Sequence, residues 1–160
     1  MAATQPKADA TLRLSRTIPA GREAIFRAWT DKEALTRWFA PSAEFETSVP
    51  VLELRPGGRY RVEMRKGEAN HVVVGEYREV RPPERLVFTW RWEDKQETRD
   101  RRVGLEDTIV TVEFHDRGRS TELVPTHENF ATVESRDEHN VGWNGCLDQL
   151  AAFVSERRES

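Results

Sequence analysis

The sequence predicts an α+β fold, in which a curved antiparallel sheet of about six to seven strands is covered by one long C-terminal helix. Three observations predict it. Two short helical segments follow the first strand, strands with period-two hydrophobicity fill the middle of the chain, and a long amphipathic segment ends it. A long helix has to bury its apolar face, and in this order of elements only the inner face of the sheet is available.

The composition indicates one domain and excludes several classes of protein. We expect a disordered leader at residues 1–10 and a single domain at residues 11–157. The net charge of −3 argues against a nucleic-acid-binding surface. The single cysteine excludes an intramolecular disulfide and a cysteine-based zinc cluster. Without a signal peptide or an apolar run of about 18 residues, the chain is expected to be cytoplasmic with no membrane span.

The N-terminal elements follow from hydrophobic spacing and capping. Apolar and polar residues alternate along residues 11–18, which predicts a half-buried strand. Apolar side chains then return at helical spacing over residues 25–29. Thr30 to Glu33 matches a capping box, so a second short helix is predicted to start at Asp31, and Pro41 is expected to close it.

The middle of the chain predicts a series of antiparallel strands. Pro50 interrupts the strand predicted at residues 45–54, which indicates an edge position or a bulge. Gly57 and Gly58 are expected to supply positive φ angles to the following tight turn. The further strands are predicted at residues 60–65, 71–80, 86–92, 109–114 and 121–126, with a charged, solvated loop at residues 93–106.

The C-terminal segment predicts a long helix that starts near the capping-box match at residues 135–138. Its predicted apolar face comprises His139, Gly142, Trp143, Cys146, Leu147, Leu150 and Val154. Each of its two glycines costs about 1 kcal/mol relative to alanine. We predict that they give Trp143 room beside a close backbone contact, at the rim of a cavity. Gly142 on the inner face either allows close approach or leaves open space, and Gly145 lies further round the helix.

Five segments of the chain together resemble the activator of heat-shock-protein-90 ATPase homologue-like family. They are residues 26–41, 54–64, 75–90, 120–123 and 139–150, in the family's order. That family belongs to the steroidogenic-acute-regulatory-related lipid-transfer and polyketide-cyclase superfamily. The resemblance implies a helix-grip fold, in which the sheet wraps the C-terminal helix around an internal cavity. It implies no single reaction, because members include ligand carriers, cyclases and a co-chaperone domain.

A cavity between sheet and helix would be lined by large apolar side chains with a few polar anchors. The candidate ligand-binding residues are Trp38, Tyr60, Met64, Tyr77, Phe88, Trp90, Trp92, His127, Phe130, His139, Trp143 and Leu147. The alternative is that the aromatic residues simply fill the core. His127 and His139 could orient a ligand by hydrogen bonds, or could have a capping or surface role. We expect Cys146 to act as a small buried hydrophobe, and we predict no catalytic residue, no metal site and no cofactor.

Three functions follow as hypotheses. The leading one is non-catalytic binding of a small hydrophobic or aromatic molecule, including a lipid, by a monomer or weak homodimer. The second, from the family resemblance alone, is a stress-response co-chaperone whose partner is heat-shock protein 90; the family's co-chaperone members carry an additional N-terminal domain that ten leader residues cannot supply. The third is a polyketide-cyclase-like enzyme, which would need His127, His139, Tyr77 and Glu76 to converge in the cavity.

Overall fold

A computed structural model describes residues 10–93 and 108–159 of the chain, with side chains to residue 155. The leader predicted at residues 1–10 and the charged loop predicted at residues 93–106 therefore lie almost wholly outside the described residues. Among the helices in the described ranges, none has the length and hydropathy needed to cross a membrane.

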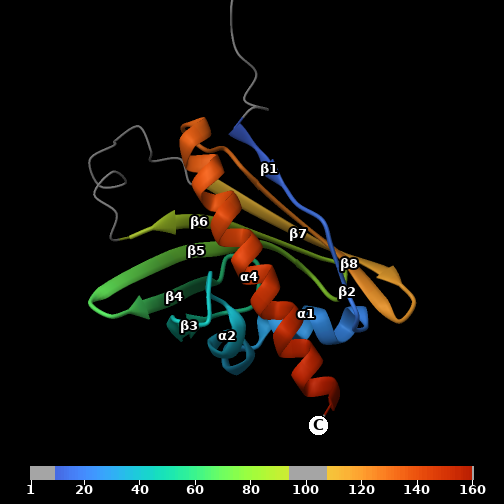
Figure 1. Ribbon diagram of the computed structural model, residues 1–160. Coiled ribbons are helices and arrows are strands. Elements are labelled where there is room, and N and C mark those ends of the chain that lie inside the picture. Colours follow the sequence, from blue (N-terminus) through green and yellow to red (C-terminus); the bar gives the residue numbers. More distant parts are fainter. Residues whose placement is uncertain (1–9, 94–107, 160) are drawn as a thin grey trace, which may run out of the picture.

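The strands form one curved antiparallel sheet (Figure 1). Its strands are β1 (Leu12–Arg13), β2 (Arg16–Ile18), β3 (Glu46–Leu52), β4 (Arg59–Lys66), β5 (Ala69–Arg81), β6 (Arg85–Trp92), β7 (Thr108–Arg117) and β8 (Ser120–Glu128). The order across the sheet is β1-β8-β7-β6-β5-β4-β3, and β2 also pairs with β8. The predicted first strand is thus divided into two short strands, β1 and β2, which both pair with β8. The predicted antiparallel arrangement is confirmed.

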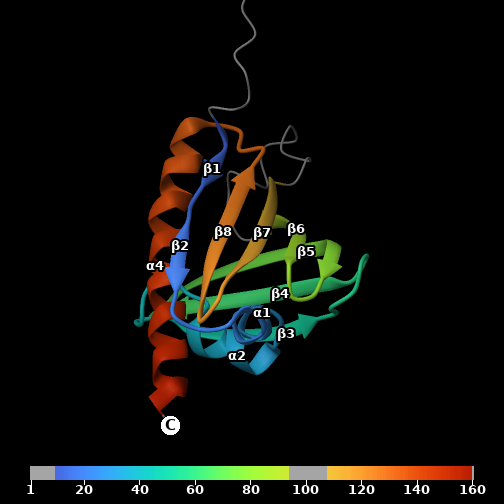
Figure 2. The same ribbon diagram turned by 90° about the vertical axis from the view of Figure 1, so that its right-hand side faces the viewer.

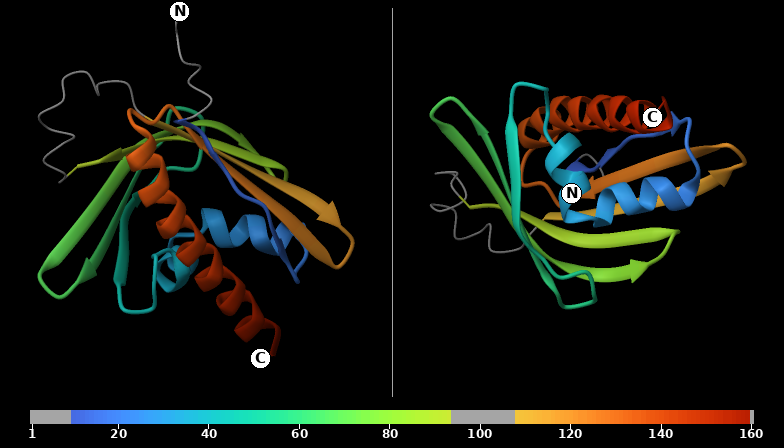
Figure 3. Two further views of the ribbon diagram at one scale, coloured as in Figure 1. Left: turned by 45° about the horizontal axis from the view of Figure 1, so that its top comes forward. Right: turned by 90° about the horizontal axis from the view of Figure 1, so that it is seen from below.

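Three described helices complete the fold: α1 (Arg22–Thr30), α2 (Lys32–Trp38) and α4 (Val133–Glu159). The sheet bends strongly, and α4 runs along the inside of the bend (Figure 3). Figure 2 shows α4 on one side of the sheet, with α1 and α2 gathered at one end of it. This is the predicted helix-grip arrangement, with two short helices after the first strand.

The N-terminal ends of α2 and α4 differ in two details from the capping prediction. The N-cap of α2 is Asp31, whose carboxylate accepts a hydrogen bond from the Ala34 N–H at 3.0 Å. The predicted start is therefore right, but Thr30 belongs to α1 and its hydroxyl donates to the Phe26 carbonyl oxygen. Helix α4 begins before its predicted capping box, because the Thr132 hydroxyl accepts from the Ser135 N–H at 3.0 Å.

The predictions for Pro50 and Gly57 are confirmed, whereas the positive φ angle predicted for Gly58 is wrong. Strand β3 is at the edge, and its pairing with β4 shifts between Ser48 and Val51, around Pro50. Gly57 has the expected positive φ of 86°. Gly58 does not; it is needed because an added Cβ would lie 2.0 Å from the Glu53 carbonyl oxygen.

The inner face of the sheet carries the core, as the alternation predicts. In β4 the apolar residues Tyr60 and Met64 are buried while Arg61 and Glu63 form an ion pair on the outer face, with their Nε and Oε2 atoms 2.8 Å apart. In β6 the same alternation buries Leu86, Phe88 and Trp90 and leaves Trp92 half-buried. The Trp90 ring meets the Trp143 indole of α4, which also packs against Trp29 of α1, and Trp29 in turn meets Trp38 of α2. Aromatic side chains therefore form much of the core under the long helix.

Candidate functional site

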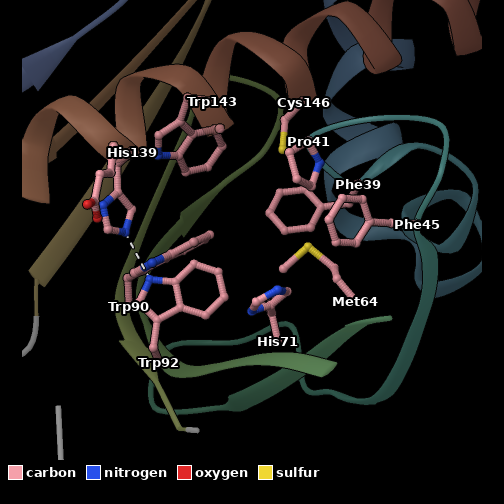
Figure 4. Close-up of a pocket in the computed structure, with 12 residues that line it drawn as sticks. Phe39, Pro41, Phe45, Met64, His71, Trp90, Trp92, His139, Trp143 and Cys146 are labelled. Atoms are coloured by element: carbon pink, nitrogen blue, oxygen red, sulfur yellow. Dashed lines mark hydrogen bonds between the residues drawn. The ribbon is translucent and has the colours of Figure 1, made fainter. Parts of the chain in front are cut away.

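An open pocket of about 200 Å³ lies between the first half of α4, the inner face of β4 to β6, and the segment that joins α2 to β3 (Figure 4). The lining residues are Phe39, Pro41, Phe45, Met64, His71, Trp90, Trp92, Glu138, His139, Gly142, Trp143 and Cys146. Most of these side chains are apolar, and five are Phe or Trp. The described part of the chain thus combines a concave apolar site with a few polar groups, as ligand sites do.

The two glycines of α4 have different roles at this pocket. A Cβ added to Gly142 would meet no atom within 4 Å, so Gly142 leaves open space in the pocket wall. A Cβ added to Gly145 would lie 2.0 Å from the Pro41 carbonyl oxygen, so Gly145 lets the α2–β3 segment approach the helix. The close backbone contact and the open space predicted from sequence both exist, but the contact belongs to Gly145.

One wall of the pocket is held by a hydrogen bond between Trp92 and His139. The Trp92 indole N–H donates to His139 Nε2 at 2.9 Å, and His139 Nδ1 lies 2.7 Å from the Ser135 carbonyl oxygen. A carbonyl only accepts, so His139 Nδ1 carries the hydrogen and Nε2 is the acceptor. The neutral imidazole satisfies both contacts, and both ring nitrogens are used within the protein.

His127, which does not line the pocket, hydrogen-bonds to Trp143, the second indole of the pocket wall. Trp143 Nε1–H donates to His127 Nδ1 at 3.0 Å, and His127 Nε2 lies 2.9 Å from the Thr108 hydroxyl oxygen. Because an indole only donates, the neutral His127 donates from Nε2 to Thr108, whose hydroxyl donates in turn to the Trp90 carbonyl oxygen at 2.8 Å. Burial, together with the neighbouring His139, lowers the pKa of His127 well below its ordinary value. The ring therefore stays neutral and keeps its acceptor nitrogen.

His71 reaches the pocket from β5, on the side opposite α4 (Figure 4). Its imidazole lies between two aromatic rings, with centroid distances of 6.1 Å to Phe45 and 6.3 Å to Trp92. Neither of its nitrogens has a hydrogen-bond partner among the described residues. It is therefore a polar group that a molecule in the pocket could meet.

Cys146 presents an unreactive thiol to the pocket. Burial raises the pKa of the thiol to about 12, and a hydrogen bond with the Ala40 backbone only partly opposes this shift. A thiol, not a thiolate, is therefore present near neutral pH, and the thiol is a poor nucleophile. The side chain behaves as the small buried hydrophobe expected from the sequence.

Five of the twelve ligand-binding candidates line the pocket: Met64, Trp90, Trp92, His139 and Trp143. The other seven do not line it, because they pack elsewhere in the core: Trp38, Tyr60, Tyr77, Phe88, His127, Phe130 and Leu147. For example, the Trp38 indole donates to the Ala28 carbonyl oxygen at 2.9 Å, and the Tyr60 hydroxyl donates to the Thr89 carbonyl oxygen at 2.5 Å. The inner face is therefore only partly a pocket wall.

Seven residues that line the pocket were not among the candidates predicted from the sequence: Phe39, Pro41, Phe45, His71, Glu138, Gly142 and Cys146. A signal for His71 was present, because period two places it on the same face as the buried residues Val73 and Tyr77. Another was the density of Phe and Pro residues over residues 39–45. Of the groups considered for a cyclase, His127 and His139 lie together, with ring centroids 5.1 Å apart. The four groups still do not converge in the pocket, because Glu76 is exposed on the outer face and His127 is buried behind Trp143.

A bent antiparallel sheet around a C-terminal helix, with a pocket between them, defines a helix-grip protein. The family model described as Activator of Hsp90 ATPase homolog 1-like protein matches residues 19–155, and the chain belongs to this family.

Solved structures of bacterial proteins support the same assignment. A protein from Chromobacterium violaceum is 30% identical with a TM-score of 0.78, covering 91% of this chain and 96% of its own. The AHSA1 protein of Silicibacter pomeroyi is 29% identical with a TM-score of 0.77, covering 92% and 99%. A protein from Arthrobacter aurescens has the same fold at 16% identity, with a TM-score of 0.79 and coverages of 96% and 90%. The search of curated proteins found no match to the chain.

Proposed function

We propose that this protein binds a small, mostly apolar ring compound in the pocket between the sheet and α4. The observation that supports the proposal is an open pocket of about 200 Å³ walled by two phenylalanines and three tryptophans. A cavity of about 150 Å³ lined by apolar side chains holds benzene. The volume therefore favours one ring or two fused rings over a long-chain lipid.

The walls of the pocket are fixed before a ligand arrives. Trp92 and Trp143 are each held by a hydrogen bond to a histidine, and the rings of Trp90 and Trp143 pack with centroids 5.2 Å apart. A wall that is already ordered loses little conformational entropy on binding. Useful affinity for a compound with few atoms depends on such a wall, because a small ligand makes few contacts.

Filling the pocket from the helix tests the proposal. Gly142→Leu directs a side chain into the open space, and it also replaces a glycine by a strong helix former. We expect wild-type protein to bind naphthalene or indole in isothermal titration calorimetry, and Gly142→Leu to lose this binding while folding at least as stably. The matched control is Val141→Leu at the exposed neighbouring position, which should bind as wild type does. The proposal would be contradicted if neither probe bound wild type, or if Gly142→Leu bound the probes as tightly as wild type does.

Each of the two alternative functions, co-chaperone and cyclase, can be tested by its own assay. Stimulation of the ATPase of heat-shock protein 90 by the purified chain would support a co-chaperone role in the stress response, which the family description alone suggests. Turnover of an aromatic polyketide would support a cyclase, although of the four polar groups proposed for it His127 and His139 lie together while Glu76 is exposed on the outer face. The cytoplasmic location and the monomeric or weakly dimeric state stay predictions, the latter measurable by light scattering.

A further inference from the structure

Among the polar side chains that line the pocket, the half-buried His71 imidazole and the exposed Glu138 carboxylate have no hydrogen-bond partner among the described residues. The other lining imidazole, His139, has both nitrogens engaged by Trp92 and Ser135. The Cys146 thiol is in contact with the Ala40 backbone. Trp90 Nε1 has no partner within the described part of the chain either, but protein atoms cover it, so a ligand in the pocket does not reach it.

The surroundings of His71 restrict what it can bind. Phe45 and Trp92 flank the imidazole, so a molecule that reaches its nitrogens also lies against aromatic rings. A neutral imidazole offers one donor and one acceptor, and a hydroxyl group can pair with either nitrogen. A ring compound that carries a hydroxyl therefore satisfies His71 and the apolar wall together.

The charge of the lining favours a neutral ligand over an acid. Glu138 is the lining side chain that carries a formal charge near neutral pH, and the described lining includes no lysine or arginine. A carboxylate that left water for this pocket would lose its hydration without gaining a cationic partner. A neutral hydroxyl loses much less, because a single hydrogen bond replaces its water.

We propose that His71 is a specificity-determining residue that selects neutral hydroxylated aromatic compounds, of the phenol or naphthol class, for this pocket. The inference rests on the proposed function, since it assigns a ligand class to the same site. His71 accepts from or donates to the hydroxyl, while the rings of Trp90, Trp92 and Phe45 contact the aromatic part of the ligand. His139 and His127 position the indoles and do not contact the hydroxyl.

A ligand–variant cycle tests the proposal. Dissociation constants for naphthalene, 2-naphthol and 2-naphthoate are measured by calorimetry for wild type, His71→Phe and His71→Gln, whose folding is checked by thermal unfolding. Phe keeps the flat ring without its nitrogens, and Gln keeps a donor and an acceptor. The preference for 2-naphthol over naphthalene should fall about three- to tenfold in His71→Phe, as expected for loss of one hydrogen bond, and should be largely kept in His71→Gln. Wild type should bind 2-naphthoate roughly tenfold more weakly than 2-naphthol.

The cycle separates this inference from the proposed function. If naphthalene and 2-naphthol both fail to bind wild type, the pocket proposal itself is wrong. If both bind and His71→Phe keeps the wild-type preference, the pocket is a binding site but His71 does not select the ligand. Tighter binding of 2-naphthoate than of 2-naphthol would overturn the assignment to neutral compounds.

Discussion

The two glycines of α4 should respond to alanine with opposite changes in stability. Alanine at either position gains about 1 kcal/mol of helix propensity. At Gly142 nothing lies within 4 Å of the new Cβ, so the gain should be retained. We expect Gly142→Ala to raise the free energy of unfolding by about 1 kcal/mol and the melting temperature by about 2–4 °C.

At Gly145 the same methyl group meets the backbone of the α2–β3 segment. Its Cβ would lie 2.0 Å from the Pro41 carbonyl oxygen and 2.9 Å from the carbonyl carbon. Backbone atoms cannot rotate away as a flexible side chain can, so the helix and the segment have to separate. Overpacking of this kind costs about 1–3 kcal/mol. Gly145→Ala should therefore be less stable than Gly142→Ala by up to about 3 kcal/mol.

Urea denaturation followed by far-ultraviolet circular dichroism measures this difference. With a slope of about 2 kcal/mol per molar urea, a difference of about 1–3 kcal/mol should separate the midpoints of the two variants by about 0.5–1.5 M, at similar slopes. Val141→Ala serves as the control for changes at an exposed position of the same helix turn. Equal midpoints for the two glycine variants, or a lower midpoint for Gly142→Ala than for wild type, would refute the assignment of space and contact to these glycines.

Three further predictions concern His127 and Asp31. His127→Phe keeps a ring but leaves the buried Trp143 N–H without an acceptor, so it should lower the free energy of unfolding by about 1–3 kcal/mol in urea denaturation. Burial lowers the pKa of His127, so as the pH decreases the unfolded chain takes up the proton before the folded chain does. The free energy of unfolding of wild type should therefore decrease as the pH is lowered from about 6.5, and this group should contribute at most about 1.4 kcal/mol per pH unit. An equally steep decrease in His127→Phe would contradict this prediction. Asp31→Ala should cost about 0.5–2 kcal/mol by removing the cap of α2, whereas Asp31→Asn should cost less; equal losses in thermal unfolding would exclude capping.

The features that the sequence predicts well are those set by neighbouring residues. Alternation fixed the inner faces of β4 and β6, and Pro50 marked both the edge strand and its bulge. Helix starts were less certain, because two possible caps stood close together in each case. Thr30 competed with Asp31, and Ser135 competed with Thr132. Both members of each pair have an oxygen that can accept the same kind of hydrogen bond, so the backbone path decides between them.

The pocket was harder to predict than the fold. Trp38 and Trp90 are both aromatic and both buried, yet only Trp90 lines the pocket. The difference arises because the segment over residues 39–45 crosses the inner face and meets α4 at Gly145. Which side chains border the remaining space depends on how three distant segments pack. Periodicity within one segment shows the direction of a side chain and not what lies opposite to it.

The histidines show how an apolar wall can still determine which polar group is exposed to a ligand. An indole N–H in such a wall needs an acceptor, and His127 and His139 supply acceptors to Trp143 and Trp92. Each histidine satisfies its second nitrogen within the protein, at Thr108 and Ser135 respectively. Two of the three imidazoles in or beside the pocket are thereby committed to holding its walls. Because this leaves His71 as the imidazole with unused nitrogens among the described residues, selection of a neutral hydroxylated ligand should depend on β5, with the exposed Glu138 of α4 as the other unpaired polar group of the lining.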